Sequence, residues 1–222
     1  MSDGTLLIGN RRYSSWSMRG WLAVRLANLD VDITVAHFIR PGPTPLIEQT
    51  SPTGLVPYLE HKGARVWESL SVCEYCAEIK PILWPADRAA RAQARSIAAE
   101  MLSGLRGLRQ NMWMNLGRDF SGRGRVPEAL ADIARIEAML ADTRARFGAG
   151  GPFLFGADFT AADVMYAPVV TRFLTWKPEL TAATRAYADA VRAHPLVAEW
   201  YAAAAREPDD WLVAAYEAAP AI

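Results

Sequence analysis

The chain has 222 residues, of which 51% are hydrophobic and 22% are charged, so it can bury a substantial core, and disordered, collagen-like and fibrous classes are excluded. Its 24 basic side chains are balanced by 24 acidic ones, which leaves no global positive field to attract phosphate backbones or an anionic membrane surface. We therefore expect a globular protein of two modest domains, with neither nucleic acid nor membrane among its partners.

Two features of the sequence indicate its compartment. No run of apolar residues reaches the ~18–20 that a membrane span needs, and the N-terminal segment lacks the basic start and long apolar stretch of a secretory signal. The only cysteines, Cys73 and Cys76, are too few for a disulfide framework. We expect a cytoplasmic protein in which both thiols are free.

The N-terminal third alternates between strand-like and helix-like patterns. Short apolar or alternating runs predict strands, and apolar residues three and four apart predict helices. In chain order the predicted elements are strand 5–8, helix 17–29, strand 31–38, a short helix 46–50, strands 55–60 and 65–67, and helix 69–79. This part is therefore expected to begin β-α-β and to continue with a hairpin and a further helix.

A segment with two prolines, from Lys80 to Asp87, separates this part from the rest. Proline disfavours helix at the residue before it and suits the first turn of a new helix. Beyond this segment the chain is rich in Ala, Arg and Leu, with helical spacing and no strand pattern. We expect an α/β N-terminal domain over residues 1–82 and an all-α C-terminal domain over residues 83–222.

Hydroxyl side chains cluster in the turn between the first predicted strand and the first helix, in the run Tyr13-Ser14-Ser15-Trp16-Ser17-Met18-Arg19. Serine is a preferred helix N-cap, so one interpretation of the cluster is purely structural. The other is a site that holds a thiolate or another anion, because unpaired N–H groups and the helix dipole favour negative charge there. The spacing alone leaves both open.

Two further short patterns follow. Val56-Pro57 opens a predicted strand, where a proline is tolerated and a cis peptide bond can occur. Glu68-Ser69 stands at the junction of a strand and a helix, where it is either a capping pair or part of a binding site.

Taken in order, these features resemble the glutathione S-transferase family over nearly the whole chain. The β-α-β start, the Val-Pro turn, the Glu-Ser pair, the proline linker and the all-helical second half occur in the family's order. The opening Ser14-Ser15-Trp16-Ser17-Met18-Arg19 is similar to the zeta-class pattern, also found in maleylacetoacetate isomerases, with Trp16 where that pattern has cysteine. The resemblance implies a thioredoxin-like N-terminal domain, an all-α C-terminal domain and the glutathione S-transferase architecture.

The resemblance also implies roles for individual residues. Ser14 matches the family's catalytic serine, and Ser15 matches its neighbour. Val56-Pro57 matches the family's cis-proline turn, in which the backbone of the first residue pairs with the cysteinyl part of glutathione. Glu68-Ser69 matches the pair that receives the γ-glutamyl end of the tripeptide.

In the helical half, the resemblance implies one structural motif and two candidate substrate residues. The segment from Thr160 to Asp163 matches the family's buried capping box. Arg109 and Arg172 are candidates to bind a carboxylate of the substrate. For both arginines, the alternative is a solvated side chain on the surface.

Activation of glutathione requires stabilisation of negative sulfur. A free thiol has a pKa of about 8.5, yet the thiolate is the nucleophile. A hydroxyl hydrogen bond to a charged acceptor contributes about 1.5–3 kcal/mol, which corresponds to about one to two pKa units. One serine can therefore ionise much of the bound thiol at neutral pH. The motif favours Ser14, while Tyr13, Ser15 and Ser17 stay open as the hydroxyl nearest the sulfur.

Other candidate sites receive structural interpretations. Cys73 and Cys76 have the spacing of a redox pair, but they lie inside a later helix rather than ahead of the first one, so buried thiols are expected. The three histidines lack ligand spacing, and no metal is expected. Four tryptophans on helical apolar faces are expected in the core: Trp21, Trp113, Trp176 and Trp200.

The expected function is that of a glutathione S-transferase that activates the thiol of glutathione, its co-substrate, for attack on a small electrophile. One alternative is a zeta-like glutathione-dependent cis-trans isomerase of the maleylacetoacetate type. The other is a non-catalytic glutathione-binding or ligand-binding stress protein of the same fold. The resemblance further implies a homodimer.

Overall fold

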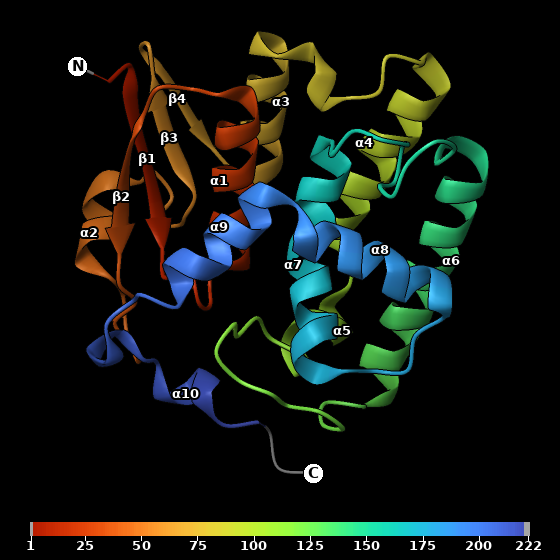
Figure 1. Cartoon of the computed structure of the whole chain (residues 1–222). Helices are drawn as coiled ribbons and strands as arrows, with labels where there is room; N and C mark the ends of the chain where they lie inside the picture. Colours follow the sequence, from red (N-terminus) through yellow and green to blue (C-terminus); the bar gives the residue numbers. More distant parts are fainter. Residues whose placement is uncertain (1, 220–222) are drawn as a thin grey trace.

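The computed structural model describes residues 2–219. Figure 1 shows a small twisted sheet on one side of the molecule and a bundle of helices on the other. The four strands lie in the order β2-β1-β3-β4. β1 (Gly4–Gly9) pairs in parallel with β2 (Asp32–Ala36) and antiparallel with β3 (Tyr58–His61), and β3 pairs antiparallel with β4 (Ala64–Trp67).

Helices cover both faces of the sheet. Because side chains alternate along a strand, Leu6 and Ile8 of β1 face α1 (Ser15–Ala27) and α3 (Ser69–Ile79), and all of these elements contribute to one core. Leu7 faces the opposite side, where it joins a small apolar cluster with Ile47 of the short helix α2 (Pro45–Thr50).

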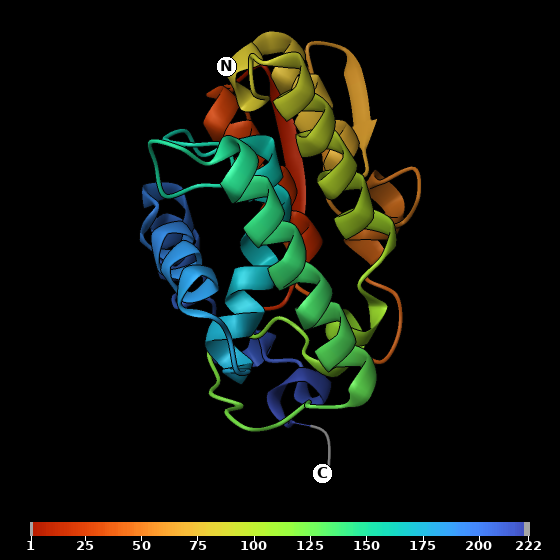
Figure 2. The same cartoon turned by 90° about the vertical axis from the view of Figure 1, so that its right-hand side faces the viewer.

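The rest of the described chain is helical, as predicted. A short turn of 3₁₀ helix, η1 (Pro81–Leu83), leads into it, and Figure 2 shows α4 and α6 as two long helices on its outer side. The helices in order are α4 (Arg88–Ser103), α5 (Arg106–Asn111), α6 (Pro127–Phe147), α7 (Ala161–Trp176), α8 (Ala182–Ala193), α9 (Pro195–Ala204), the 3₁₀ turn η2 (Asp209–Trp211) and α10 (Ala214–Glu217).

Helix α1 joins the two parts into one core. Its Trp21 packs against Trp200 of α9, with 5.4 Å between ring centroids. Its Arg19 is fully buried and donates from Nε to the carbonyl oxygen of Met165 in α7 at 2.8 Å. The sheet and the helices are therefore held together through α1.

The predicted capping box is present at the start of α7. The buried Asp163 carboxylate accepts hydrogen bonds from the Thr160 N–H at 2.9 Å, from the Leu154 N–H at 3.0 Å and from the Tyr187 hydroxyl at 3.1 Å. It also accepts one from the Thr160 hydroxyl. This carboxylate fixes the start of a helix that is buried along almost its whole length.

Some predicted boundaries and positions are wrong. The strand expected over 55–60 begins only at Tyr58, because Pro57 has no N–H to give to the ladder. Trp113 is only partly buried, whereas the other three tryptophans lie in the core as expected. Cys73 and Cys76 are buried free thiols, which confirms the structural interpretation of that pair.

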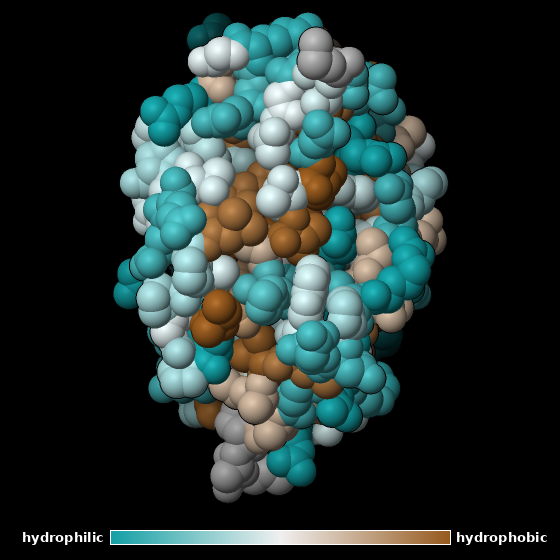
Figure 3. All heavy atoms as spheres, turned by 90° about the vertical axis from the view of Figure 1, so that its left-hand side faces the viewer, coloured by the Kyte–Doolittle hydropathy of each residue, from teal (hydrophilic) through white to brown (hydrophobic). Residues whose placement is uncertain are grey.

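Two surface properties complete the description. Seen from the side of β2 and α2, hydrophobic atoms form separate small patches among polar ones (Figure 3). Patches of this kind are ordinary on protein surfaces, and we assign no partner to that face. None of the helices in residues 2–219 combines the length and apolar character needed to cross a membrane.

We predict that Asp163→Ala lowers the free energy of unfolding by about 3 kcal/mol, because it leaves several buried donors without an acceptor. Urea unfolding followed by circular dichroism measures this loss. The matched control is Asp189→Ala on the exposed side of α8, for which a change within about 0.5 kcal/mol is expected. Equal stability of the two variants would contradict the structural role of Asp163.

Candidate functional site

A cavity of about 430 Å³ lies where the turn before α1 meets the helical part of the chain. Residues of the N-terminal part and residues of the helical part both line this cavity. The lining residues that carry polar or aromatic groups include Ser14, Ser15, Trp16, Arg109, Trp113, Arg172 and Tyr216. Val56, from the turn before β3, completes the wall on the side of the sheet. Five of the predicted site residues therefore meet in one cavity: Ser14, Ser15, Val56, Arg109 and Arg172.

Ser14 is the N-cap of α1, so the capping interpretation is correct for this residue. Its Oγ accepts a hydrogen bond from the Ser17 N–H at 3.3 Å and donates to the Ser17 Oγ at 2.7 Å. The Ser17 Oγ also accepts from the Gly9 N–H at 2.9 Å, and Ser17 is fully buried outside the cavity lining. A cap that also lines a cavity can serve both roles.

Ser15 lies one residue further, at the start of α1. Its Oγ accepts a hydrogen bond from Nη2 of Arg172 at 3.3 Å. The hydroxyl proton of Ser15 has no acceptor among the described residues. A positive donor polarises this O–H group, and its proton is available to a group in the cavity.

Tyr13 is committed to a different contact. Its hydroxyl donates to a carboxylate oxygen of Glu217 in α10 and accepts from the Val213 N–H. Burial, and then the hydrogen bond to Glu217, raise the pKa of the Tyr13 phenol. Burial alone would raise the pKa of Glu217, but hydrogen bonds from Tyr13, Arg118 and Asn115 lower it overall. Tyr13 therefore anchors the C-terminal segment beside the cavity.

The turn at Val56-Pro57 has a cis peptide bond. Pro57 packs against α1 at Gly20, where a Cβ would come within 2.7 Å of the proline ring, so this contact requires glycine. The backbone N–H and C=O of Val56 have no partner among residues 2–219. They are free to pair with an extended peptide in the cavity.

Glu68 and Ser69 do not form the capping pair that was the structural alternative for them. Glu68 has a φ of 69°, a region that non-glycine residues rarely adopt, and makes no capping hydrogen bond. Ser69 is fully buried, and its Oγ has no hydrogen-bond partner in the described chain. Neither residue lines the cavity itself, but Glu68 is close enough to Arg109 to influence its pKa.

Three arginines cluster at the cavity: Arg109 and Arg172 line it, and Arg19 is fully buried outside the lining. Arg172 is 3% exposed and Arg19 is 0% exposed, so the surface alternative is wrong for Arg172. Arg109 is half-buried. Each has one buried guanidinium nitrogen without a hydrogen-bond partner: Nη2 of Arg19 and Nε of the other two. None of the three forms an ion pair with a described carboxylate.

Burial and mutual repulsion act on the pKa values of this cluster. Burial first, and then the charge of Arg109, lower the pKa of Arg172 to about 9. Burial, and then Arg172 and Arg109, lower the pKa of Arg19 to about 9. Both groups stay positively charged at neutral pH, so the cavity carries an uncompensated positive field.

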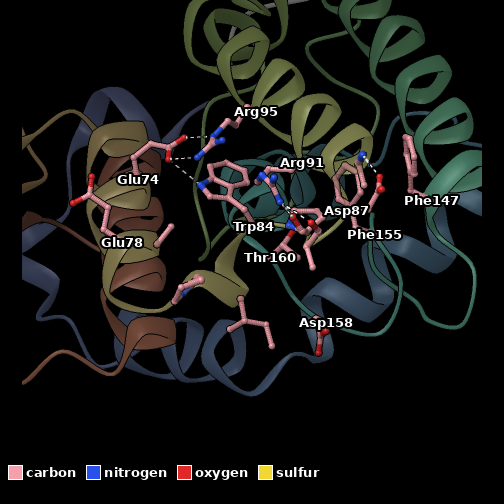
Figure 4. A pocket seen from close by; sticks show the side chains of 16 residues that line it. Glu74, Glu78, Trp84, Asp87, Arg91, Arg95, Phe147, Phe155, Asp158 and Thr160 are labelled. Atoms are coloured by element: carbon pink, nitrogen blue, oxygen red, sulfur yellow. Dashed lines mark hydrogen bonds and ion pairs between the residues drawn. The ribbon is translucent and has the colours of Figure 1, made fainter.

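A larger hollow of about 840 Å³ lies elsewhere, between α3, α4 and the loop before α7. It contains none of the predicted site residues. Figure 4 shows Arg95 donating to Glu74, at 2.9 Å and 3.0 Å, and Arg91 donates to the backbone carbonyls of Pro85 and Ala86. The contact between Arg95 and Glu74 joins α4 to α3, so this hollow lies at a structural junction of helices.

The fold and the cavity together define a two-part protein, with a thioredoxin-like sheet and a helical bundle around one site. Residues 13–79 match the family model of the glutathione S-transferase N-terminal domain, and residues 88–203 match that of the C-terminal domain. The chain belongs to the glutathione S-transferase family, whose members are glutathione-dependent transferases and isomerases.

The individual proteins that the chain resembles share less than a third of its residues. The chain is 28% identical over 180 residues to a rat maleylacetoacetate isomerase, covering 77% of this chain and 78% of that protein. A Burkholderia glutathione transferase homologue, solved with bound glutathione, has a TM-score of 0.68 at 21% identity, over 92% of this chain and 99% of that one. A mango tau-class enzyme has a TM-score of 0.67 at 20% identity, over 90% and 92%. At these identities the structures show the fold alone.

Sequence reasoning missed several cavity residues. Trp16 was noted only as a departure from the zeta pattern, and Trp113 was placed in the core. Nothing in the sequence points to Tyr216, which lines the cavity from the far end of the chain, or to Glu217, which binds the hydroxyl of Tyr13 beside it. The signal for Trp16 was its identity, because a large aromatic residue in a turn of serines needs a neighbour to pack against.

We predict that Tyr13→Phe loosens the C-terminal segment and leaves the ionisation of a thiol bound in the cavity unchanged. Loss of the hydrogen bond to Glu217 is expected to speed tryptic cleavage at Arg206 about fivefold, because local opening becomes easier. Tyr75→Phe, which removes a hydroxyl bonded to His61 instead, is the control and should leave the cleavage rate unchanged. An unchanged rate in Tyr13→Phe would show that this contact does not hold the segment.

Proposed function

We propose that the cavity binds glutathione with its sulfur at the Ser14 and Ser15 hydroxyls and activates it for attack on a small electrophile that carries a carboxylate. One observation carries this proposal. Two serine hydroxyls at a helix N-terminus line the same cavity as two guanidinium groups that have no carboxylate partner. The first pair suits a thiolate, and the second pair suits an anionic substrate.

Both serines are able to donate to sulfur. The Ser15 proton has no other acceptor, and its oxygen is polarised by Arg172. The Ser14 proton goes to Ser17; if only this proton rotates toward sulfur, the Ser14 Oγ keeps the hydrogen bond from the Ser17 N–H and the Ser17 Oγ keeps the one from Gly9. Redirecting Ser14 toward a thiolate therefore leaves no buried group without a partner.

The remainder of glutathione has matching partners. The free backbone groups of Val56 suit the peptide group at the cysteinyl residue. At the start of α3, the buried Ser69 hydroxyl and the first N–H groups of the helix suit the carboxylate of the γ-glutamyl end. The exposed Glu68 carboxylate supplies a partner for its amino group.

In the reaction, the thiolate attacks an electrophilic carbon and forms a C–S bond. With a substitution substrate the leaving group departs with the bonding electron pair, and with an activated alkene a proton adds to the neighbouring carbon. The chain itself lowers the thiol pKa, orients the sulfur at the end of α1 and holds the anionic group of the electrophile with Arg109 and Arg172.

The arginine cluster favours a second candidate, a glutathione-dependent cis-trans isomerase. The thiolate adds to one carbon of a conjugated double bond, rotation follows about the resulting single bond, and expulsion of the thiolate restores the alkene. A substrate with carboxylates on either side of the bond would use both Arg109 and Arg172. The rat and mouse relatives are named maleylacetoacetate isomerase, which supports this candidate.

We also propose that the chain works as a cytoplasmic homodimer. β4 is an edge strand of the sheet, and it ends in Trp67, which is 44% exposed. Exposed large apolar side chains at a sheet edge suit burial against a second copy of the chain.

We predict that Ser14→Ala and Ser15→Ala each raise the pKa of the bound glutathione thiol by about one unit, because each removes a donor to the charged sulfur. A pH titration followed by the ultraviolet absorbance of the thiolate measures this shift. In the unaltered protein the bound thiol pKa should lie below that of free glutathione. Bound glutathione with an unshifted pKa would indicate a binding protein instead of an enzyme.

We predict that Arg109→Gln raises KM about tenfold for chlorodinitrobenzoate and leaves KM for neutral chlorodinitrobenzene unchanged. The two electrophiles share one substitution reaction and differ in a carboxylate, and an Arg–carboxylate contact contributes about 1.5–3 kcal/mol. Steady-state kinetics at saturating glutathione give both values. An equal effect on both electrophiles would show that Arg109 does not read the carboxylate.

A further inference from the structure

Trp16 lies between two of the three arginines of the cavity. The guanidinium carbon of Arg19 is 4.6 Å from the centroid of its ring, and that of Arg109 is 5.4 Å from it. Arg19 comes from the next turn of α1, and Arg109 comes from α5 in the other part of the chain. The indole therefore bridges two like charges that would otherwise only repel each other.

The other contacts of the cluster are also uncharged. Arg19 donates to the carbonyls of Met165 and Ser15, and Arg172 donates to the carbonyl of Pro168. Asp132 and Glu68 act on the pKa of Arg109 only from a distance. A carboxylate in direct contact would hold the guanidinium groups equally well, but it would occupy the donors that an anionic ligand needs.

An aromatic ring can hold a guanidinium group without occupying its hydrogen-bond donors. Its negative face attracts a cation without accepting a hydrogen bond through the edge of the guanidinium group. Of the two stacked arginines, Arg109 lines the cavity, and its buried Nε accordingly keeps its hydrogen-bonding capacity. The ring orders the arginines and leaves their charge uncompensated.

We infer that Trp16 is a positioning residue, which holds Arg109 at the cavity in place of a carboxylate and thereby gives the site its preference for carboxylate-bearing ligands. The inference rests on the proposed function only in taking the bound carboxylate to be part of the electrophile. The alternative is that Trp16 only forms part of the cavity wall, a role that any apolar side chain of similar size could fill.

Substitutions at position 16 distinguish a positioning role from a role as part of the cavity wall. Phenylalanine keeps an aromatic face, and leucine keeps apolar bulk without one. Binding of succinate, a simple dicarboxylate, is measured by calorimetry on the full chain without glutathione. We expect Trp16→Phe to bind within about threefold of the unaltered protein and Trp16→Leu to bind about tenfold more weakly.

A matched control makes the same change elsewhere. Trp211→Leu removes an indole that stacks on His37, with no arginine on it and outside the cavity lining, and should leave the succinate affinity unchanged. Thermal unfolding of each variant confirms that it is folded at the temperature of the assay. Succinate binding by folded Trp16→Leu at the unaltered affinity would overturn the inference, as would equal losses in Trp16→Phe and Trp16→Leu.

Kinetics give an independent readout. In Trp16→Leu, KM for chlorodinitrobenzoate should rise about tenfold more than KM for chlorodinitrobenzene, and Trp16→Phe should restore the ratio of the two. A loss shared by both electrophiles would overturn the inference. The titration of the bound thiol tests the proposed function separately, because a normal thiol pKa together with the predicted succinate pattern would reject that function and leave the role of Trp16 intact.

Discussion

The burial of α1 between the sheet and α7 is the constraint on which the rest of the structure depends. One side of this helix packs on β1 and α3, and its Trp21 and Arg19 reach α9 and α7 on the other side. The helix therefore cannot shift without disturbing both parts of the molecule. Because its N-terminus opens into the cavity, the serines at that end are held as rigidly as the core itself.

The same constraint places positive charge where water cannot fully solvate it. Desolvation of a guanidinium group is costly, and buried arginines usually pair with carboxylates. Here backbone carbonyls stabilise Arg19 and Arg172 only in part, with the face of Trp16 over Arg19, and one guanidinium nitrogen of each has no acceptor among the described residues. This incomplete compensation is the basis on which we propose an anionic ligand, because a fully paired cluster would have no donors left for one.

In the proposed function, the two parts of the chain bind different molecules. The sheet side offers a helix N-terminus, a free backbone edge at Val56 and the buried Ser69 hydroxyl, all of which suit a peptide with a thiol. The helical side offers Arg109 and Arg172, which suit the carboxylates of a second molecule. The C-terminal segment contributes Tyr216 to the cavity wall and engages the hydroxyl of Tyr13, which is why the proposed function gives the serines the contact with sulfur.

The sequence predicts the features that depend on neighbours in the chain: the helix that starts at the serines, the turn at Pro57, the capping box at Thr160, and the order of elements that marks the family. It did not determine the burial of Arg172, the stacking of Arg19 and Arg109 on Trp16, or the contact from Tyr13 to Glu217. Local patterns follow from backbone preferences within a few residues, whereas these contacts join positions far apart in the chain. Only tertiary packing decides which side chains face one cavity and how much of their charge stays unpaired.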